Sequence, residues 1–250
     1  MSELFSIQLQ NRQQQGRDGV WLDLPTTTEQ VQAALRQIGI SSDNPQGLFI
    51  SGYFAEEEKR FAIPYNMVLA SNVDELNFLA SRLETLSAGE RAELNAALQA
   101  PQSELFSIGR ITDFPENVDY YVHLPDVHGP AQLGDYYLNR SGMVDMPEEW
   151  KGGIDTAQFG RYVAQQEQGV FTEYGYLVKS GDVWQKVHEG QPVPEEYRVL
   201  SFPVPEVMRD AANIPPPVQP ETEPQKVIPI ILNGKDSAER MKEITDRLET

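Results

Sequence analysis

The chain has 250 residues, and its 38 acidic and 20 basic residues give it a formal charge of −18 and a pI of about 4.5. This length is enough to bury a core in one or two domains, and the charge argues against nucleic acid and anionic membrane surfaces as partners. The absence of cysteine excludes disulfides, thiolate metal sites and cysteine nucleophiles. The sequence carries neither a signal-peptide pattern nor an apolar run of membrane-spanning length, so we expect a soluble, cytoplasmic protein.

Residues 1–63 predict a small β-β-α-β domain. Apolar runs at 4–9, 19–24 and 48–54 are typical of strands, and a polar segment containing glycine joins the first two. A helix is predicted between the second and third strands. Thr26 and Glu29 have the spacing of a capping box at its start, and apolar residues then recur on one face.

Residues 64–101 predict a helical domain. Asn72 is a candidate N-cap for a helix whose leucines fall on one face, and Ser87 with Glu90 forms a capping box before a second helix. Pro101 ends that helix, because proline lacks the N–H that a helix requires.

Residues 102–190 predict a mixed α/β domain. A short helix is expected at 133–142, and Asp155 with Gln158 predicts the start of a longer one. We expect Trp150 and Phe159 to pack beneath the surface at this point. The predicted strands cover residues 105–111, 119–124, 170–178 and 182–188, with a turn at Ser180–Gly181 between the last two.

Residues 191–250 predict a Pro-rich tail. Closely spaced prolines indicate a flexible or polyproline-type linker at about 211–226, and 237–250 reads as a short amphipathic helix. The chain stops inside this helix without a C-cap, which suggests a fragment of a longer protein. The predicted fold class is therefore α+β, an elongated chain of three small domains followed by this tail.

Candidate catalytic motifs are few. His123, Asp126 and His128 form the best metal candidate, but their spacing fits no strong zinc pattern. The sequence has no nucleophile elbow, phosphate-binding loop or dinucleotide fingerprint. We therefore expect no enzyme, no metal and no cofactor, and a hydrolase built on the histidine loop is the alternative. The tyrosines are expected in cores or interfaces.

The ordered segments of the chain resemble the ArdA family of antirestriction proteins over about residues 4–185. The resemblance rests on GVWLDLP running into a helix, on DELNFLASRLETLS in the middle, and most closely on residues 134–179. In that last segment the matching positions are Tyr136, Tyr137, Pro147, Ile154, Asp155, Gly160 and Arg161.

The resemblance implies a DNA mimic that is not an enzyme. ArdA proteins, carried by conjugative plasmids and transposons, look like three small domains in a row. They form curved dimers whose carboxylates imitate DNA phosphates and occupy the DNA-binding groove of type I restriction-modification enzymes. A homodimer of this chain would carry −36, twice the −18 of one chain, against roughly 20 phosphates per turn of B-DNA. No direct binding to nucleic acid or membrane is expected.

Surface carboxylates are the expected partner-binding groups. Residues 102–190 hold 14 acidic and 6 basic residues, a balance of −8. Asp155 is expected to cap a helix, while Asp145, Glu148 and Glu149 lie on the loop before it. The candidate phosphate-mimicking carboxylates are Asp113, Glu116, Asp119, Asp126, Asp135, Asp145, Glu148, Glu149 and Asp155.

Two departures from the family pattern leave alternatives open. Residues 115–134 are less acidic than the resemblance implies, which leaves an acidic mobile-element adaptor, or an inhibitor of another nucleic-acid-binding defence complex, as the second hypothesis. Residues 226–249 resemble the start of ArdC-type mobile-element modules, which implies a fusion of two anti-defence domains.

Overall fold

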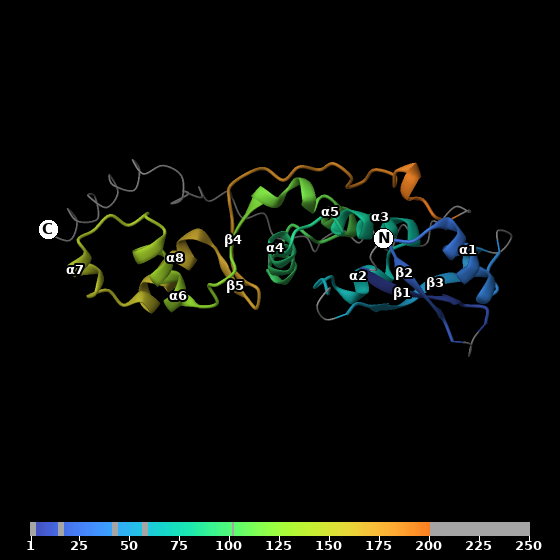
Figure 1. Cartoon of the computed structure of the whole chain (residues 1–250), viewed down its shortest axis with the longest axis horizontal. Coiled ribbons are helices and arrows are strands. Elements are labelled where there is room, and N and C mark those ends of the chain that lie inside the picture. The colour runs from blue at the N-terminus through green and yellow to red at the C-terminus, as the bar shows by residue number, and fades with distance from the viewer. Residues whose placement is uncertain (1–3, 15–17, 42–44, 57–59, 102, 201–250) are drawn as a thin grey trace, which may run out of the picture. The chain divides into compact units, whose positions relative to one another are not determined.

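The computed structural model describes residues 4–14, 18–41, 45–56, 60–101 and 103–200. These residues form two compact units (Figure 1). Unit 1 contains the chain up to Val118 and the segment that starts at Trp184, and unit 2 runs from Asp119 to Val183. The linker, terminal helix and ArdC-like module predicted beyond residue 200 lie outside the described residues.

Each unit combines helices with a small antiparallel sheet, which confirms the α+β class. The division into domains at 1–63, 64–101 and 102–190, with a tail at 191–250, stays a prediction. None of the helices in the described ranges is long and apolar enough to cross a membrane.

Unit 1 begins with a three-stranded antiparallel sheet in the order β2-β1-β3. Ile7 and Leu9 alternate with more polar side chains along β1, so one face of the sheet is apolar and packs against the core. The three strands predicted here are confirmed. They are β1 (Phe5–Asn11), β2 (Val20–Leu24) and β3 (Leu48–Phe54), with a short 3₁₀ turn η1 (Pro45–Gly47) before the last.

The helix α1 (Thr28–Gln37) covers part of this core with Val31, Ala34 and Leu35. Its capping box lies one residue later than predicted, since Thr27 and Gln30 make the reciprocal bonds. Thr26 is buried instead, and its N–H donates to Asn77.

The helical part of unit 1 follows. Both predicted helix starts are confirmed, with capping boxes at Asn72/Glu75 and Ser87/Glu90. The strand predicted at 105–111 is wrong, because Ser107 caps a short helix by accepting from the N–H of Arg110. The elements are α2 (Tyr65–Leu69), α3 (Val73–Leu83), α4 (Ala88–Gln99), α5 (Ile108–Thr112), η3 (Phe114–Glu116) and η4 (Val118–Tyr120).

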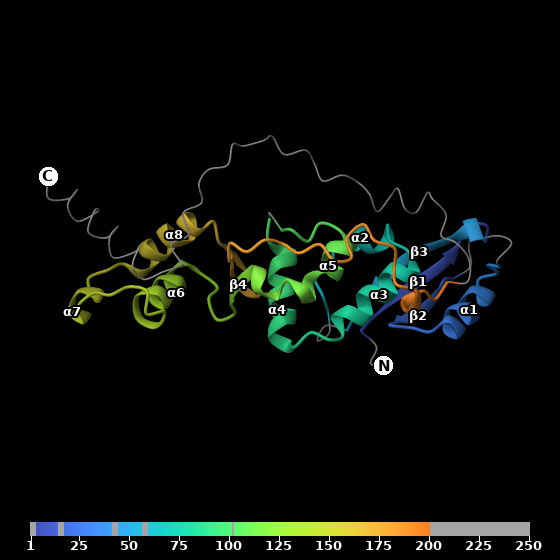
Figure 2. The same ribbon diagram turned by 90° about the horizontal axis from the view of Figure 1, so that it is seen from above.

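The chain returns to unit 1 at residues 184–200, which run back along α5 and α3 in both views (Figures 1 and 2). The strand predicted at 182–188 is wrong, since this stretch forms no strand. Its backbone N–H groups donate to side chains of unit 1 instead, among them Asp113 and Asn117. A 3₁₀ turn, η6 (Glu195–Tyr197), lies near its end.

Unit 2 contains a second antiparallel sheet in the order β4-β6-β5. The predicted strand at 170–178 is a hairpin, because Thr172 pairs with Gly175 across a turn and Gly175 has a φ of 121°. The two helices predicted in this unit, at 133–142 and after Asp155, are confirmed as α6 with η5 and as α8. The unit contains β4 (Tyr121–Leu124), α6 (Pro130–Asp135), the π-helix η5 (Tyr136–Arg140), α7 (Glu148–Lys151), α8 (Thr156–Glu167), β5 (Val170–Thr172) and β6 (Gly175–Lys179).

Two glycines bring α6 and α8 into close contact. A Cβ at Gly134 would lie 1.9 Å from the Thr156 carbonyl oxygen, and one at Gly160 would lie 1.8 Å from the Pro130 carbonyl oxygen. Only glycine fits at both positions. The core beside this contact contains Val127, Leu133, Tyr137, Val163, Tyr176 and Val178.

Candidate partner-binding surface

Unit 2 carries a surplus of exposed carboxylates. Residues 119–183 hold 10 acidic and 4 basic residues, a balance of −6. Asp119, Asp126, Asp145 and Glu149 are exposed, and within the described part of the chain they make no ion pair or hydrogen bond through their carboxylates. Four negative charges are therefore available to a partner without first breaking an internal contact.

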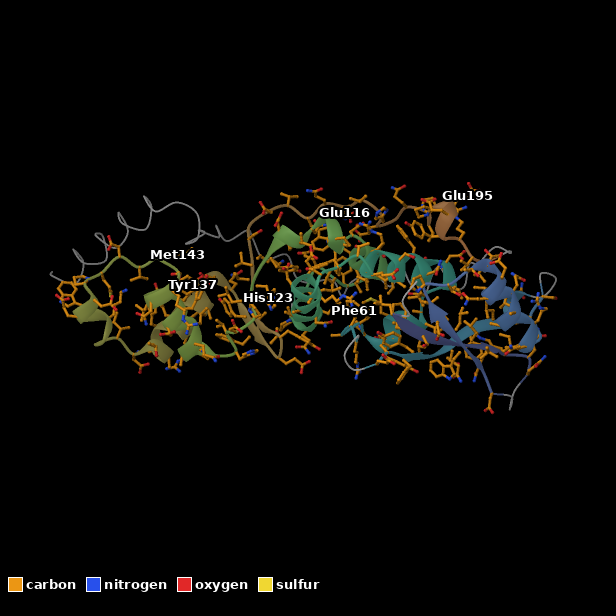
Figure 3. The ribbon with its side chains drawn as sticks, in the orientation of Figure 1. Phe61, Glu116, His123, Tyr137, Met143 and Glu195 are labelled. Atoms are coloured by element: carbon orange, nitrogen blue, oxygen red, sulfur yellow. The ribbon has the colours of Figure 1, made fainter. Side chains whose placement is uncertain are left out.

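The segment that leads into α7 concentrates three of the predicted carboxylates. Figure 3 marks Met143 on this segment, and Asp145, Glu148 and Glu149 follow along the chain. Glu148 forms an ion pair with Lys151 at 3.0 Å, but its side chain stays 82% exposed. A contact this exposed contributes little to stability, so Glu148 can exchange it for a basic group on a partner.

Two further predicted carboxylates have local structural partners. Asp135 accepts from Asn139 at 2.8 Å and from Arg140 at 2.5 Å, and these two bonds lower the pKa of Asp135. Asp155 is the predicted N-cap of α8 and accepts from the N–H of Gln158 at 3.0 Å. Asp135 is partly exposed and Asp155 is exposed, but each also holds local structure.

Asp113 and Glu116 lie in unit 1, at the end of α5 and in η3. The expected exposure of Asp113 is wrong, because its side chain is 0% exposed and accepts from the N–H groups of Val187, His188 and Glu189. Glu116, marked in Figure 3, is partly buried and forms an ion pair with Arg82. Both carboxylates make contacts within unit 1, and Asp113 is not a surface carboxylate.

The aromatic residues beside the acidic segment divide between surface and core. The expected burial of Trp150 is wrong, since this side chain is 66% exposed. Phe159 packs against the core of unit 2 as predicted. Tyr162 is also exposed, at 53%. Sequence reasoning missed the exposure of Trp150, although its charged and glycine neighbours were a signal for it.

The residues of the histidine loop differ in exposure and in their contacts. His123 is half-buried in β4, with its Nε2 2.7 Å from the carbonyl oxygen of Tyr174 (Figure 3 marks His123). Asp126 and His128 are exposed in the loop that follows. Across the residues that the structure describes, no group of three or more His, Cys, Asp or Glu side chains is placed to hold a metal ion.

One half-buried acid in unit 2 was not singled out from the sequence. Glu167, at the end of α8, accepts from the hydroxyl of Tyr137 at 2.5 Å and from that of Tyr176 at 3.0 Å. Burial raises the pKa of Glu167, and the two hydroxyl groups oppose that rise. Tyr137 and Tyr176 belong to the core and Glu167 is half-buried beside them (Figure 3 marks Tyr137), so this cluster serves structure rather than a partner.

The comparison with protein families gives the same assignment as the sequence. The sequence model of the ArdA antirestriction protein family matches residues 15–178. This match covers more than half of the chain and includes β2 to β5, most of β6, α1 to α8 and the acidic segment, while β1 lies before it. The chain belongs to the ArdA family of antirestriction proteins. No curated protein matches it.

Proposed function

We propose that the chain inhibits a type I restriction-modification enzyme by occupying its DNA-binding groove, with carboxylates in place of DNA phosphates. The family gives the antirestriction function. The observation that carries the mechanism is a set of four carboxylates in unit 2 that are exposed and have no partner among the described residues: Asp119, Asp126, Asp145 and Glu149. A groove that binds DNA is basic, and it attracts such a surface.

The proposal extends to assembly and location. The chain acts in the cytoplasm, where a mobile element would deliver it, as a homodimer and as an inhibitor rather than an enzyme. It needs no cofactor and binds neither nucleic acid nor membranes directly. Light scattering after size-exclusion chromatography measures the dimer, and a monomer at micromolar concentration would contradict that part of the proposal.

A competition assay tests the mechanism. A purified type I enzyme is mixed with a DNA fragment that carries its recognition site, and ATP-dependent cleavage is measured as the chain is added. Cleavage falls, more DNA restores it, and added salt weakens the inhibition, because salt screens charge pairs between the partners. Cleavage that continues unchanged at a large excess of the chain would overturn the proposal for that enzyme.

A second candidate function is an acidic adaptor for another basic partner, such as a different nucleic-acid-binding defence complex. The exposed Trp150 favours this reading, because aromatic side chains are enriched where proteins bind proteins. Capture of partners on the immobilised chain separates the two functions. Recovery of a type I enzyme supports the first, and recovery of only other basic proteins supports the second.

A further inference from the structure

Residues 184–200 lie beyond the segment that the family matches, and they pack on unit 1 in an extended path. We call this segment the strap. It leaves unit 2 after Val183 and runs along α5 and then α3 (Figures 1 and 2). Its side chains are mostly exposed or half-buried, and Val199 is the buried exception.

The first half of the strap is held by two side chains, Asp113 at the end of α5 and Asn117 at the end of η3. The buried carboxylate of Asp113 accepts from three consecutive backbone N–H groups, the closest being that of His188 at 2.6 Å. Asn117, which is 4% exposed, makes two hydrogen bonds to the backbone of Gln185. Its Oδ1 accepts from the Gln185 N–H at 2.7 Å, and its Nδ2 donates to the Gln185 carbonyl at 3.0 Å.

The second half of the strap is held in the same manner by α3. Asn77 donates to the carbonyl of Tyr197 at 2.9 Å, and Asp74 accepts from the N–H groups of Val199 at 2.7 Å and Leu200 at 2.9 Å. Asn77 and Asp74 are 3% and 9% exposed. Both halves of the strap are therefore held by buried Asp and Asn side chains that form hydrogen bonds with its backbone.

Three strap side chains add specificity to this backbone recognition. The rings of His188 and Tyr197 both contact Phe78 on α3, with centroid distances of 4.9 and 4.7 Å. Glu189 forms an ion pair with the buried Arg110 at 3.0 Å. Rings and a charge at fixed intervals along an extended backbone are features by which proteins recognise peptides.

We propose that the face of unit 1 formed by α3, α5 and η3 is a peptide-binding site, and that the strap is its intramolecular ligand. Four buried polar side chains, Asp74, Asn77, Asp113 and Asn117, are directed at backbone groups of the bound segment rather than at its side chains. Such a site accepts an extended peptide. Peptides with aromatic rings that reach Phe78 and an acidic side chain that reaches Arg110 should bind best. This inference does not depend on the DNA-mimic proposal.

A labelled peptide with the sequence of residues 184–200 tests the site on the full chain. In wild type the strap occupies the site at a high effective concentration, so the peptide binds weakly. In the variant with His188→Ala and Tyr197→Ala, which loses the ring contacts of its own strap, fluorescence anisotropy detects peptide binding at least about tenfold tighter than in wild type. Adding Asn117→Ala to that variant weakens the peptide about tenfold again, since it removes two hydrogen bonds.

A scrambled peptide and circular dichroism of each variant complete the experiment. A folded double variant that binds no peptide would overturn the proposal, as would equal binding by wild type and variant or by the scrambled peptide. Loss of the fold in the double variant would also overturn it, because the strap would then be part of the core rather than a ligand.

Discussion

The backbone N–H of His188 donates a 2.6 Å hydrogen bond to the buried carboxylate of Asp113, 75 residues earlier in the chain. The neighbouring N–H groups of Val187 and Glu189 donate to the same carboxylate. A charge in this position remains buried because three donors solvate it in place of water. The residue that sequence reasoning assigned to the partner surface instead joins two distant parts of unit 1.

Replacing Asp113 with Ala is therefore expected to destabilise unit 1. The change leaves three backbone donors without their acceptor and costs about 3 kcal/mol in the free energy of unfolding. Urea denaturation followed by circular dichroism measures this cost. Asp119→Ala is the control, because that carboxylate is exposed and unpaired, and it should change stability by less than about 0.5 kcal/mol. Equal effects of the two variants would contradict this account.

The half-buried Glu167 makes the stability of unit 2 depend on pH, and the direction of that dependence follows from its pKa shift. Burial raises the pKa of Glu167 in the folded chain above its ordinary value, so the folded state binds the proton more tightly than the unfolded state. The resulting stability is fully present below the ordinary pKa and is lost as pH rises through the raised one.

The variant Glu167→Gln isolates this contribution. Wild type should gain stability relative to the variant as pH is lowered from about 7 towards about 4, as measured by urea denaturation at each pH. Tyr137→Phe removes the 2.5 Å hydrogen bond that favours the ionised acid, and it should raise the pKa of Glu167 further. A difference between wild type and Glu167→Gln that does not vary with pH would show that Glu167 is not buried in this way.

Replacement by alanine should affect stability differently at two glycines of unit 2, one inside the contact between α6 and α8 and one outside it. Gly160→Ala places a methyl group on the backbone of Pro130 and should destabilise unit 2 by about 2 kcal/mol through overpacking. Gly152→Ala meets no atom within 4 Å at a backbone φ of −63°, so it should leave stability unchanged or raise it by about 0.5 kcal/mol. Thermal unfolding compares the two. A Gly160→Ala chain as stable as Gly152→Ala would mean that the helices do not approach so closely.

Loss of unpaired carboxylates should weaken inhibition of the restriction enzyme. The variant Asp145→Asn with Glu149→Gln removes two charges from the surface of unit 2 without breaking an internal contact. At about 1 kcal/mol for each charge pair lost, the inhibitory concentration should rise roughly tenfold or more at low salt.

Its matched control removes the same charge from unit 1. Asp18 and Glu196 are exposed and unpaired within the described residues, so Asp18→Asn with Glu196→Gln changes net charge equally. If both pairs of changes weaken inhibition to the same extent, net charge governs it and the four carboxylates of unit 2 have no particular role.

The sequence by itself determined the elements whose signals are local. The capping boxes at Asn72 and Ser87 were predictable because a cap and its partner lie three residues apart. The first three strands were predictable from apolar runs between polar turns. The ordered set of segments over about residues 4–185, with 134–179 as the closest part, was enough to indicate the antirestriction family.

Only the tertiary structure decided which carboxylates lie at the surface. Asp113 and Asp145 are both acids outside regular strands, and nothing within a few residues of either distinguishes them. Asp113 is buried because residues 187–189 return to it from far along the chain, whereas none of the segments that the structure describes covers Asp145. The segments at 105–111 and 182–188 were mistaken for strands for the same reason, since a strand requires a partner that local sequence does not reveal. Exposure and pairing depend on residues distant in sequence, and folding alone brings them together.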